Sequence, residues 1–424
     1  MGEDFLHYIW NHKKLAINKL QTVAGEPITI IRSGQHNLLA GPDFFNAQLQ
    51  IGDQHWAGNV ELHLKSSDWY VHGHETDTAY DSVILHIVWE HDVAVFRTNK
   101  QAIPTLVLKD YVSTDALANY QELFKQDNSR WIPCATTLKR VPKLTLTSWL
   151  DRLYLERLEQ KTIQIQELLD LYQNDWEAVL FNMLTQNFGT KINKDAFVSL
   201  ATALPFTVIR KCAQHPFQLE ALLLGMGDLI PDDSTDSYAL QLEGEYEFIK
   251  HKFSITTSGI LPIQFFKLRP PNFPTIRLSQ LAQVYTTHPQ LFQKILELET
   301  KHDFYTLFKI QASAYWDTHF SFGTPHKKRA KKLSKAFIDL VLINTIVPIR
   351  FAYAKYKGIE NQETLLDLIR SIGAESNSII DKFDSLGLNA KHALDTQAVL
   401  ELKNNFCDHK RCLQCGIGNW LMSK

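Results

Sequence analysis

The segment Gly58–Lys65 constrains the fold more than any other part of this chain, because its residues alternate strictly between polar and apolar. A β-strand places successive side chains on opposite faces. One face would carry the apolar residues Val60, Leu62 and Leu64, and the other Asn59, Glu61, His63 and Lys65. The pattern therefore predicts a strand that presents a carboxylate, an imidazole and an amine on one side.

A partner strand is predicted directly before this segment, at Phe45–Ile51, and Gly52-Asp53 has the residue types of a hairpin turn. Asp43 would lie at the mouth of the partner strand, where Pro42 fixes the entry of the chain. Because a hairpin folds the two strands back on each other, we expect Asp43 at the same end of the pair as Glu61.

Asp43 and Glu61, with a basic side chain beside them, would form an arrangement that binds a divalent metal ion and activates a water molecule. Mg²⁺ prefers one or two carboxylates together with phosphate oxygens of a substrate, and Mn²⁺ is the alternative ion. The same residues also fit a simpler structure, in which Glu61 and Lys65 form a salt bridge on the face of a sheet.

A Pro-Asp pair, a hairpin and a Glu with a basic residue on the next strand resemble the core of the PD-(D/E)XK nuclease superfamily. The resemblance covers roughly residues 1–95 and implies an α/β (or α+β) domain with a mixed sheet. In that family a helix precedes three strands, and a second helix leads to a fourth strand. The chain offers matching segments in this order: Glu3–Lys14, Ile28–Arg32, the two strands above, His72–Asp81 and Ser82–Trp89.

The resemblance implies a role for individual residues. Asp43 matches the first metal-binding carboxylate, Glu61 the second, and Glu3 an optional carboxylate on the opening helix. The family places a Lys where this chain has His63, and Lys65 follows two residues later on the same face. Either His63 substitutes for that Lys or Lys65 reaches into the site.

Longer phrases resemble a second family. Gly-Pro-Asp-Phe-Phe-Asn-Ala, Val-Glu-Leu-His-Leu-Lys-Ser-Ser-Asp-Trp and Arg-Pro-Pro-Asn-Phe-Pro-Thr-Ile-Arg, with the C-terminal cysteines, look like the bacterial family labelled domain of unknown function 2851. This resemblance spans essentially the full length and implies no established activity.

The length of 424 residues, with 45% hydrophobic and 21% charged residues, predicts two or three folded domains. Helical periodicity begins near Leu146, after the strand-rich part of the chain. We expect a nuclease-like α/β domain, a linker, a larger all-α region and a Cys-rich tail, at residues 1–112, 113–145, 146–404 and 405–424.

The formal net charge of −2 means that a nucleic-acid partner would need a local basic patch. One dense basic run follows a cluster of aromatic residues, and its members are Lys327, Lys328, Arg329, Lys331 and Lys332. Arg269 and Arg277 flank a proline-rich, extended segment that would hold a phosphate or stack on a base. A solvated helix face and a packed crossover are the alternatives for these two segments.

Three of the five cysteines, Cys407, Cys412 and Cys415, lie close together in the tail. Their short spacing suits a loop around a Zn²⁺ ion or an iron–sulfur cluster, with His409 or Cys134 as the fourth ligand. Some PD-(D/E)XK nucleases carry a cluster built from three C-terminal cysteines and one distant cysteine, and the resemblance therefore favours Cys134. A reduced, metal-free tail is the alternative.

The first residues lack the apolar core of a signal peptide, and no run of 18 apolar residues predicts a membrane span. We therefore expect a cytoplasmic protein with reduced thiols. Two functions fit the sequence. The first is a Mg²⁺-dependent nuclease in which Asp43, Glu61, His63 and Lys65 are catalytic; the second is a non-catalytic nucleic-acid- or protein-binding module on a degenerate nuclease fold.

Overall fold

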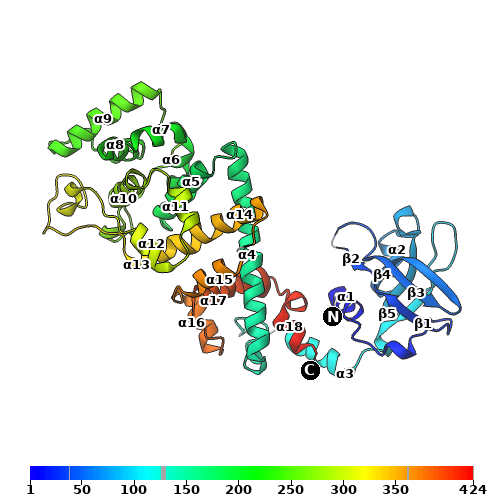
Figure 1. Ribbon diagram of the computed structural model, residues 1–424. Helices are drawn as coiled ribbons and strands as arrows, with labels where there is room; N and C mark the ends of the chain where they lie inside the picture. The colour runs from blue at the N-terminus through cyan, green and yellow to red at the C-terminus, as the bar shows by residue number, and fades with distance from the viewer. Residues whose placement is uncertain (38, 126–129, 361, 424) are drawn as a thin grey trace. The chain divides into compact units, whose positions relative to one another are not determined.

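The protein, seen in a computed structural model, consists of two compact units (Figure 1). The sheet unit comprises Met1–Trp149, Asp381–Asn389 and Leu400–Lys424, and the helical unit comprises Leu150–Ile380 and Ala390–Val399. The structure describes residues 1–37, 39–125, 130–360 and 362–423. The segment predicted as a linker and the Cys-rich tail both belong to the sheet unit.

The sheet has six strands in the order β1-β3-β4-β5-β6, with the short β2 paired to β3. β3 pairs with β1 and β4 in antiparallel fashion, whereas β5 runs parallel to β4 and β6. The strands are β1 (Ile28–Arg32), β2 (Gln35–His36), β3 (Phe44–Ile51), β4 (Gln54–Lys65), β5 (Val83–Glu90) and β6 (Thr105–Val107). The predicted mixed sheet at the start of the chain is confirmed.

β3 and β4 form the predicted hairpin, and Gly52 in its turn has a φ of 58°. The alternation in β4 separates Val60 and Leu62 from Glu61 and His63, yet all four residues are buried. The polar face of β4 is therefore covered by other parts of the sheet unit.

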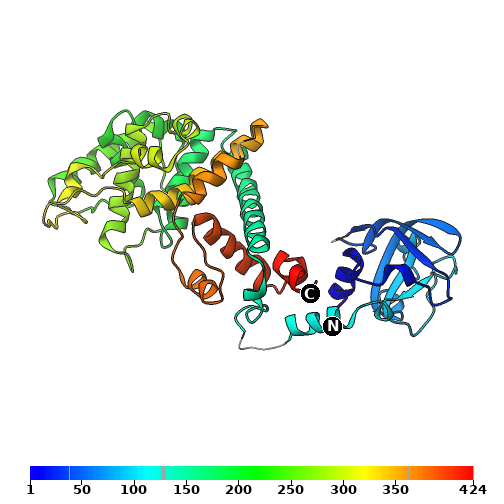
Figure 2. The same ribbon diagram turned by 60° about the horizontal axis from the view of Figure 1, so that its bottom comes forward.

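Helix α1 (Glu3–Asn11) lies beside the sheet (Figure 2). It packs its apolar side into the sheet unit, where Phe5, Leu6 and Ile9 are fully buried. Glu3 and His7 lie one helical turn apart and are only half-buried. The helix ends earlier than the predicted Lys14.

The connection from β4 to β5 crosses over the sheet, as a parallel strand pair requires. It contains α2 (Asp68–Val71) and a 3₁₀ turn, Thr78–Tyr80. Trp69 anchors it in a small core with Val83, Val95 and Ile103. The crossover thereby carries His72 and His74 to the polar face of β4.

The sheet unit also contains α3 (Thr114–Leu123), a π-helical turn at Leu402–Cys407, and α18 (Gly416–Leu421). Three helices cross the boundary between the units: α4 (Lys143–Leu171), α16 (Ser378–Ser385) and α17 (Ala393–Glu401).

The helical unit confirms the all-α character predicted for this part of the chain. Its helices are α5 (Trp176–Phe188), α6 (Lys194–Ala203), α7 (Phe206–Cys212), α8 (Pro216–Met226), α9 (Ser237–Phe253), α10 (Pro274–Thr287), α11 (Leu291–Glu297), α12 (Lys301–Leu307), α13 (Lys335–Val341), α14 (Val347–Lys357) and α15 (Gln362–Arg370). The continuous helix Lys335–Lys357 is long and apolar enough to cross a membrane, but 72% of its most apolar window is buried inside the protein. The core helix of a globular unit passes the same test.

Candidate functional site

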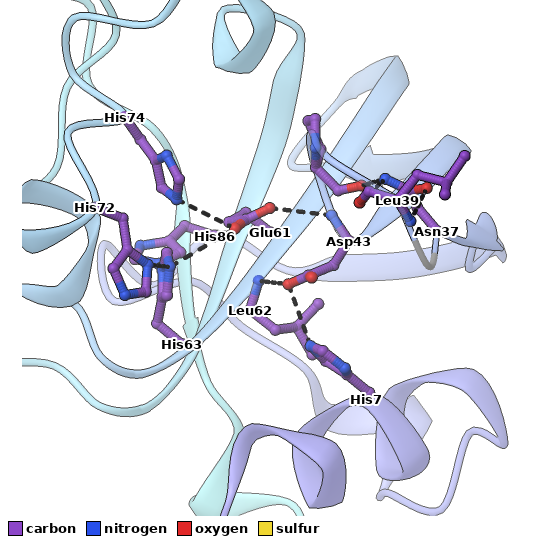
Figure 3. Close-up of polar contacts among 11 residues, drawn as sticks. His7, Asn37, Leu39, Asp43, Glu61, Leu62, His63, His72, His74 and His86 are labelled. Atoms are coloured by element: carbon purple, nitrogen blue, oxygen red, sulfur yellow. Dashed lines mark hydrogen bonds and ion pairs between the residues drawn. The ribbon is translucent and has the colours of Figure 1, made fainter. Parts of the chain in front are cut away.

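Hydrogen bonds join Asp43, directly before β3, to Glu61 and Leu62 on β4 (Figure 3). The backbone N–H of Asp43 donates to Oε2 of Glu61 over 3.0 Å, and the N–H of Leu62 donates to Oδ2 of Asp43 over 2.9 Å. Phe44, next to Asp43, pairs with Val60, next to Glu61. Strand register therefore places the two carboxylates side by side, as the hairpin predicted.

The loop before Asp43 is held by Asn37. The backbone N–H of Asn37 donates to the carbonyl of Asp43 over 2.7 Å. Its side-chain amide donates to three loop carbonyls, those of Leu39, Ala40 and Pro42. Gly41 has a φ of 102°, which a side chain would strain. The entry to β3 is thus fixed by the residues around Asp43.

Helix α1 adds two ionisable side chains to this pair. Nε2 of His7 lies 3.2 Å from Oδ2 of Asp43. Burial alone would lower the pKa of His7, but the carboxylates of Asp43, Glu3 and Glu61 outweigh it and raise the pKa. Burial raises the pKa of Glu3, and the charge of Asp43 adds to the rise. Glu3 is thus close to the site. His7 is a further ionisable neighbour of Asp43 that sequence reasoning missed.

Glu61 stands between Asp43 and a group of histidines (Figure 3). Its Oε1 lies 3.4 Å from Nε2 of His74 and 3.6 Å from Nε2 of His63. Burial raises the pKa of Glu61, and the charge of Asp43 raises it further, against the effects of His74 and the N–H of Asp43. A positive ion beside Glu61 would offset this cost of ionisation.

His63 makes two close contacts with other histidines. Its Nδ1 lies 2.9 Å from Nε2 of His86 on β5, and its Nε2 lies 3.0 Å from Nδ1 of His72 in the crossover. Burial and the charges of His74 and His72 lower the pKa of His63 to about 4. His63 is therefore neutral at pH 7 and does not supply the positive charge that a Lys at this position would bring.

Lys65 lies at the end of β4 and is exposed. Its backbone N–H donates to Asp68, and no polar contact of its side chain is present in the described part of the chain. Of the four residues predicted to be catalytic, the structure brings together Asp43, Glu61 and His63.

The sequence of residues 3–378 matches a family model described as "Protein of unknown function (DUF2851)". The chain belongs to this family. A search of curated proteins and a search of solved structures find no match. The DUF2851 match contains the whole of the Asp43–Glu61 site and ends before Cys407, so the tail lies outside it.

The two arginines predicted to contact substrate differ in exposure in this DUF2851 protein. Arg277 is buried against the ring of Phe337, 3.6 Å from its centre, and donates to Gln280 and Asn272. Its guanidinium is thus used inside the helical unit and not presented to a ligand. Arg269 is exposed, just before the 3₁₀ turn Pro270–Asn272.

The basic run also divides into two kinds of residue. Lys331 is buried, and its ammonium group donates to the carbonyls of Asp317 and Arg329 and lies 4.2 Å from the ring centre of Phe320. Lys331 therefore holds the loop together. The residues that remain exposed are Lys327, Lys328, Arg329 and Lys332.

A cavity lined by basic side chains was not predicted from the sequence. The helical unit contains a cavity of about 880 Å³, lined in part by Arg157, Lys161, Lys191 and Lys194. Burial, with a contribution from Arg157, lowers the pKa of Lys161 to about 7. These side chains are spread over two helices and a loop, so no local run of basic residues marks them.

Four cysteines line one small cavity of about 20 Å³ in the sheet unit. They are the three tail residues and the distant cysteine of the sequence analysis: Cys407, Cys412, Cys415 and Cys134. Burial and the neighbouring Cys415 raise the pKa of Cys134 to about 12, and burial raises the pKa of each of the other three. The backbone N–H groups of Ile417 and Gly418 and the side chain of Trp149 oppose this rise at Cys415.

Proposed function

We propose that this protein is a metal-dependent phosphodiesterase that cleaves nucleic acid at the Asp43–Glu61 site. The observation that carries the proposal is the interlocked pair itself, in which backbone N–H groups fix both carboxylates at one end of the hairpin. Oδ1 of Asp43 accepts no hydrogen bond within the described part of the chain, whereas Oδ2 is held by Leu62 and His7. This second oxygen of the carboxylate, Oδ1, is available to a ligand.

The donor set fits a divalent cation. Carboxylate oxygens of Asp43 and Glu61, with Glu3 nearby, are ligands that Mg²⁺ or Mn²⁺ accepts, and the raised pKa of Glu61 reflects a buried charge without a full counter-charge. When bound, such an ion lowers the pKa of a water molecule and neutralises charge on a phosphate.

The remaining side chains would orient and neutralise the substrate. His7, whose pKa is raised, would when protonated provide a positive charge beside Asp43, in place of the Lys of the PD-(D/E)XK superfamily. Neutral His63 would hold its neighbours in position through its contacts with His72 and His86.

The order of elements supports the proposal. α1, β1, β3, β4, the crossover with α2, and β5 follow one another as the resemblance to the PD-(D/E)XK superfamily implies. Exposed basic residues of the helical unit, Arg269 and the four residues of the basic run, are the proposed contacts to nucleic-acid phosphates.

We also propose that the cysteine quartet holds a zinc ion or an iron–sulfur cluster that stabilises the sheet unit. Four thiols in one cavity, three of them on buried cysteines, suit either group, and N–H groups directed at Cys415 would stabilise a thiolate. A bound cation would offset the cost of burying a charged thiolate, which raises the pKa of these thiols.

The decisive experiment measures cleavage of linear, branched and single-stranded DNA and RNA with Mg²⁺ or Mn²⁺. We expect Asp43→Asn and Glu61→Gln to lower the rate by at least about 100-fold. Asp53→Asn, at an exposed carboxylate in the β3–β4 turn, is the matched control and should cleave like the wild type. Wild-type protein that cleaves no substrate, or Glu61→Gln that retains activity, would refute the proposal.

One observation favours the second candidate function, a non-catalytic binding module. The site lacks the Lys of the PD-(D/E)XK superfamily. His63 stands at that position and is neutral, and the side chain of Lys65 makes no polar contact with the site in the described part of the chain. Nucleic-acid binding without metal-dependent cleavage would support this alternative.

A further inference from the structure

We infer that His63, His72 and His74 form a binding site for a transition-metal ion, with Zn²⁺ as the first choice. The inference deepens the proposed function, because Glu61 borders both the Asp43 site and the three histidines. Only the role of the bound ion in cleavage rests on that proposal. Each of the three histidines offers a ring nitrogen, and these nitrogens lie within 4.8 Å of one another.

The distances agree with tetrahedral coordination. Zn–N bonds of about 2.0–2.1 Å place two ligands of a tetrahedral ion about 3.3–3.4 Å apart. His63 Nε2 and His72 Nδ1 are 3.0 Å apart, and Glu61 Oε1 is 3.4 Å from His74 Nε2. Side-chain rotations that draw the three nitrogens together would centre an ion among the rings, with its fourth position toward Glu61.

His74 provides a second, independent observation. It is 7% exposed, and its Nε2 forms no hydrogen bond in the described part of the chain, where Oε1 of Glu61, 3.4 Å away, is its ion-pair partner. Leaving such a nitrogen buried without a hydrogen bond costs free energy. Its ring stacks on Tyr80, with 3.7 Å between ring centres, so the nitrogen is held facing the other histidines.

The supporting contacts resemble those of established metal ligands. Nδ1 of His63 faces Nε2 of buried His86, which fixes the orientation of the ring and leaves Nε2 of His63 for a metal. Gly73, with a φ of 75°, turns the chain between His72 and His74. His72 is exposed, so an ion can enter from solvent on its side.

The donor type selects the ion. Three imidazoles suit Zn²⁺, Co²⁺ or another transition metal, whereas Mg²⁺ prefers oxygen ligands. Glu61 Oε1 faces this site and Oε2 faces Asp43, so the carboxylate lies between a nitrogen-rich site and an oxygen-rich one. Paired metal ions of this kind stabilise the attacking and leaving oxygens of phosphate-ester hydrolysis.

The test is metal binding by the full-length protein, measured without reference to cleavage. Chelator-treated protein is titrated with Zn²⁺ and with Co²⁺, and X-ray absorption at the zinc edge reports the ligands. Imidazole ligands at about 2.0–2.1 Å are expected in addition to any sulfur ligands at about 2.3 Å, so the cysteine quartet does not confuse the result.

His72→Ala and His74→Ala should weaken binding at this site by at least about 100-fold. His55→Ala, at an exposed histidine on β4, is the matched control and should bind like the wild type. Because His72 is exposed, its removal should leave the fold intact, which circular dichroism checks.

An absorption spectrum with only sulfur ligands, or unchanged zinc affinity in His72→Ala and His74→Ala, would overturn the inference. Zinc binding at these histidines without any nuclease activity would uphold it and refute the proposed function instead. Cleavage with Mg²⁺ by a protein whose three histidines bind neither Zn²⁺ nor Co²⁺ would uphold the proposed function and overturn the inference.

Discussion

The N–H of Asp43 donates to the carboxylate of Glu61, so the two acidic residues of the candidate site are joined through the backbone of one and the side chain of the other. The bond lies between the start of β3 and the middle of β4, 18 residues apart in sequence. It keeps two negative groups together in a site where burial makes their ionisation costly.

Replacing Glu61 by Gln should stabilise the metal-free protein while it removes metal-dependent activity. A Gln amide can still accept from the N–H of Asp43, and its NH₂ group can donate to Nε2 of His74, which forms no hydrogen bond in the described part of the chain. We expect the free energy of unfolding at pH 7 to rise by about 1 kcal/mol in chemical denaturation. A loss of stability would show that the ionised carboxylate is favourable in the fold.

The cysteine quartet should contain metal when the protein is purified anaerobically. Metal analysis is expected to find about one zinc, or about four irons with visible absorption, per chain in addition to any ion at the histidines. Cys412→Ala and Cys134→Ala should lose this metal and lower thermal stability. Cys212→Ala, at a buried cysteine outside the quartet, should retain it. Freely titrating thiols in stable wild-type protein would contradict the assignment.

The exposed part of the basic run should contact phosphates. Replacing Lys327, Lys328, Arg329 and Lys332 by Ala should weaken nucleic-acid binding, and the slope of log affinity against log salt should fall by about 0.7–0.9 for each phosphate that the variant no longer neutralises. The matched control replaces four exposed lysines elsewhere in the helical unit, Lys211, Lys252, Lys355 and Lys357. If both variants bind with the wild-type slope, the run is a solvated surface.

Glu177 on α5 should make stability depend on pH. Burial, with a contribution from Asp175, raises its pKa from 4.5 to about 7, although the N–H of Phe292 opposes the rise. A carboxyl group whose pKa is raised by folding contributes stability below its unfolded pKa and loses that contribution as pH rises to the folded value. Glu177→Gln should therefore stabilise the protein little at pH 4 and by about 1–3 kcal/mol above pH 7. Denaturation at both pH values measures the difference, and an equal effect at both would contradict the assignment.

The sequence predicts the β3–β4 hairpin well because two local signals agree there. The alternation around Glu61 sets the faces of the strand, and Gly52-Asp53 sets the turn, so the meeting of Asp43 and Glu61 follows from strand register. These signals do not show which face is covered, and the burial of Glu61 and His63 depends on α1 and the crossover.

The histidine site was not predictable from local pattern. His72 and His74 have the spacing of solvated residues in a connection, and His86 that of a buried core residue. Their convergence on His63 depends on the parallel pairing of β4 with β5, a long-range choice that no short motif encodes. The prediction that Arg277 contacts substrate at the surface was wrong for a similar reason, because its partner Phe337 is distant in sequence.

The discontinuous make-up of the sheet unit has a consequence for biosynthesis. Roughly 270 residues separate Cys134 from Cys407, and a ribosome needs about 15–55 s to add them at about 5–20 residues per second. During that interval most of the helical unit has already emerged, while Cys134 still lacks the three thiols that share its cavity. If the quartet holds a metal as proposed, its loading would be a late event, one that follows nearly all of translation.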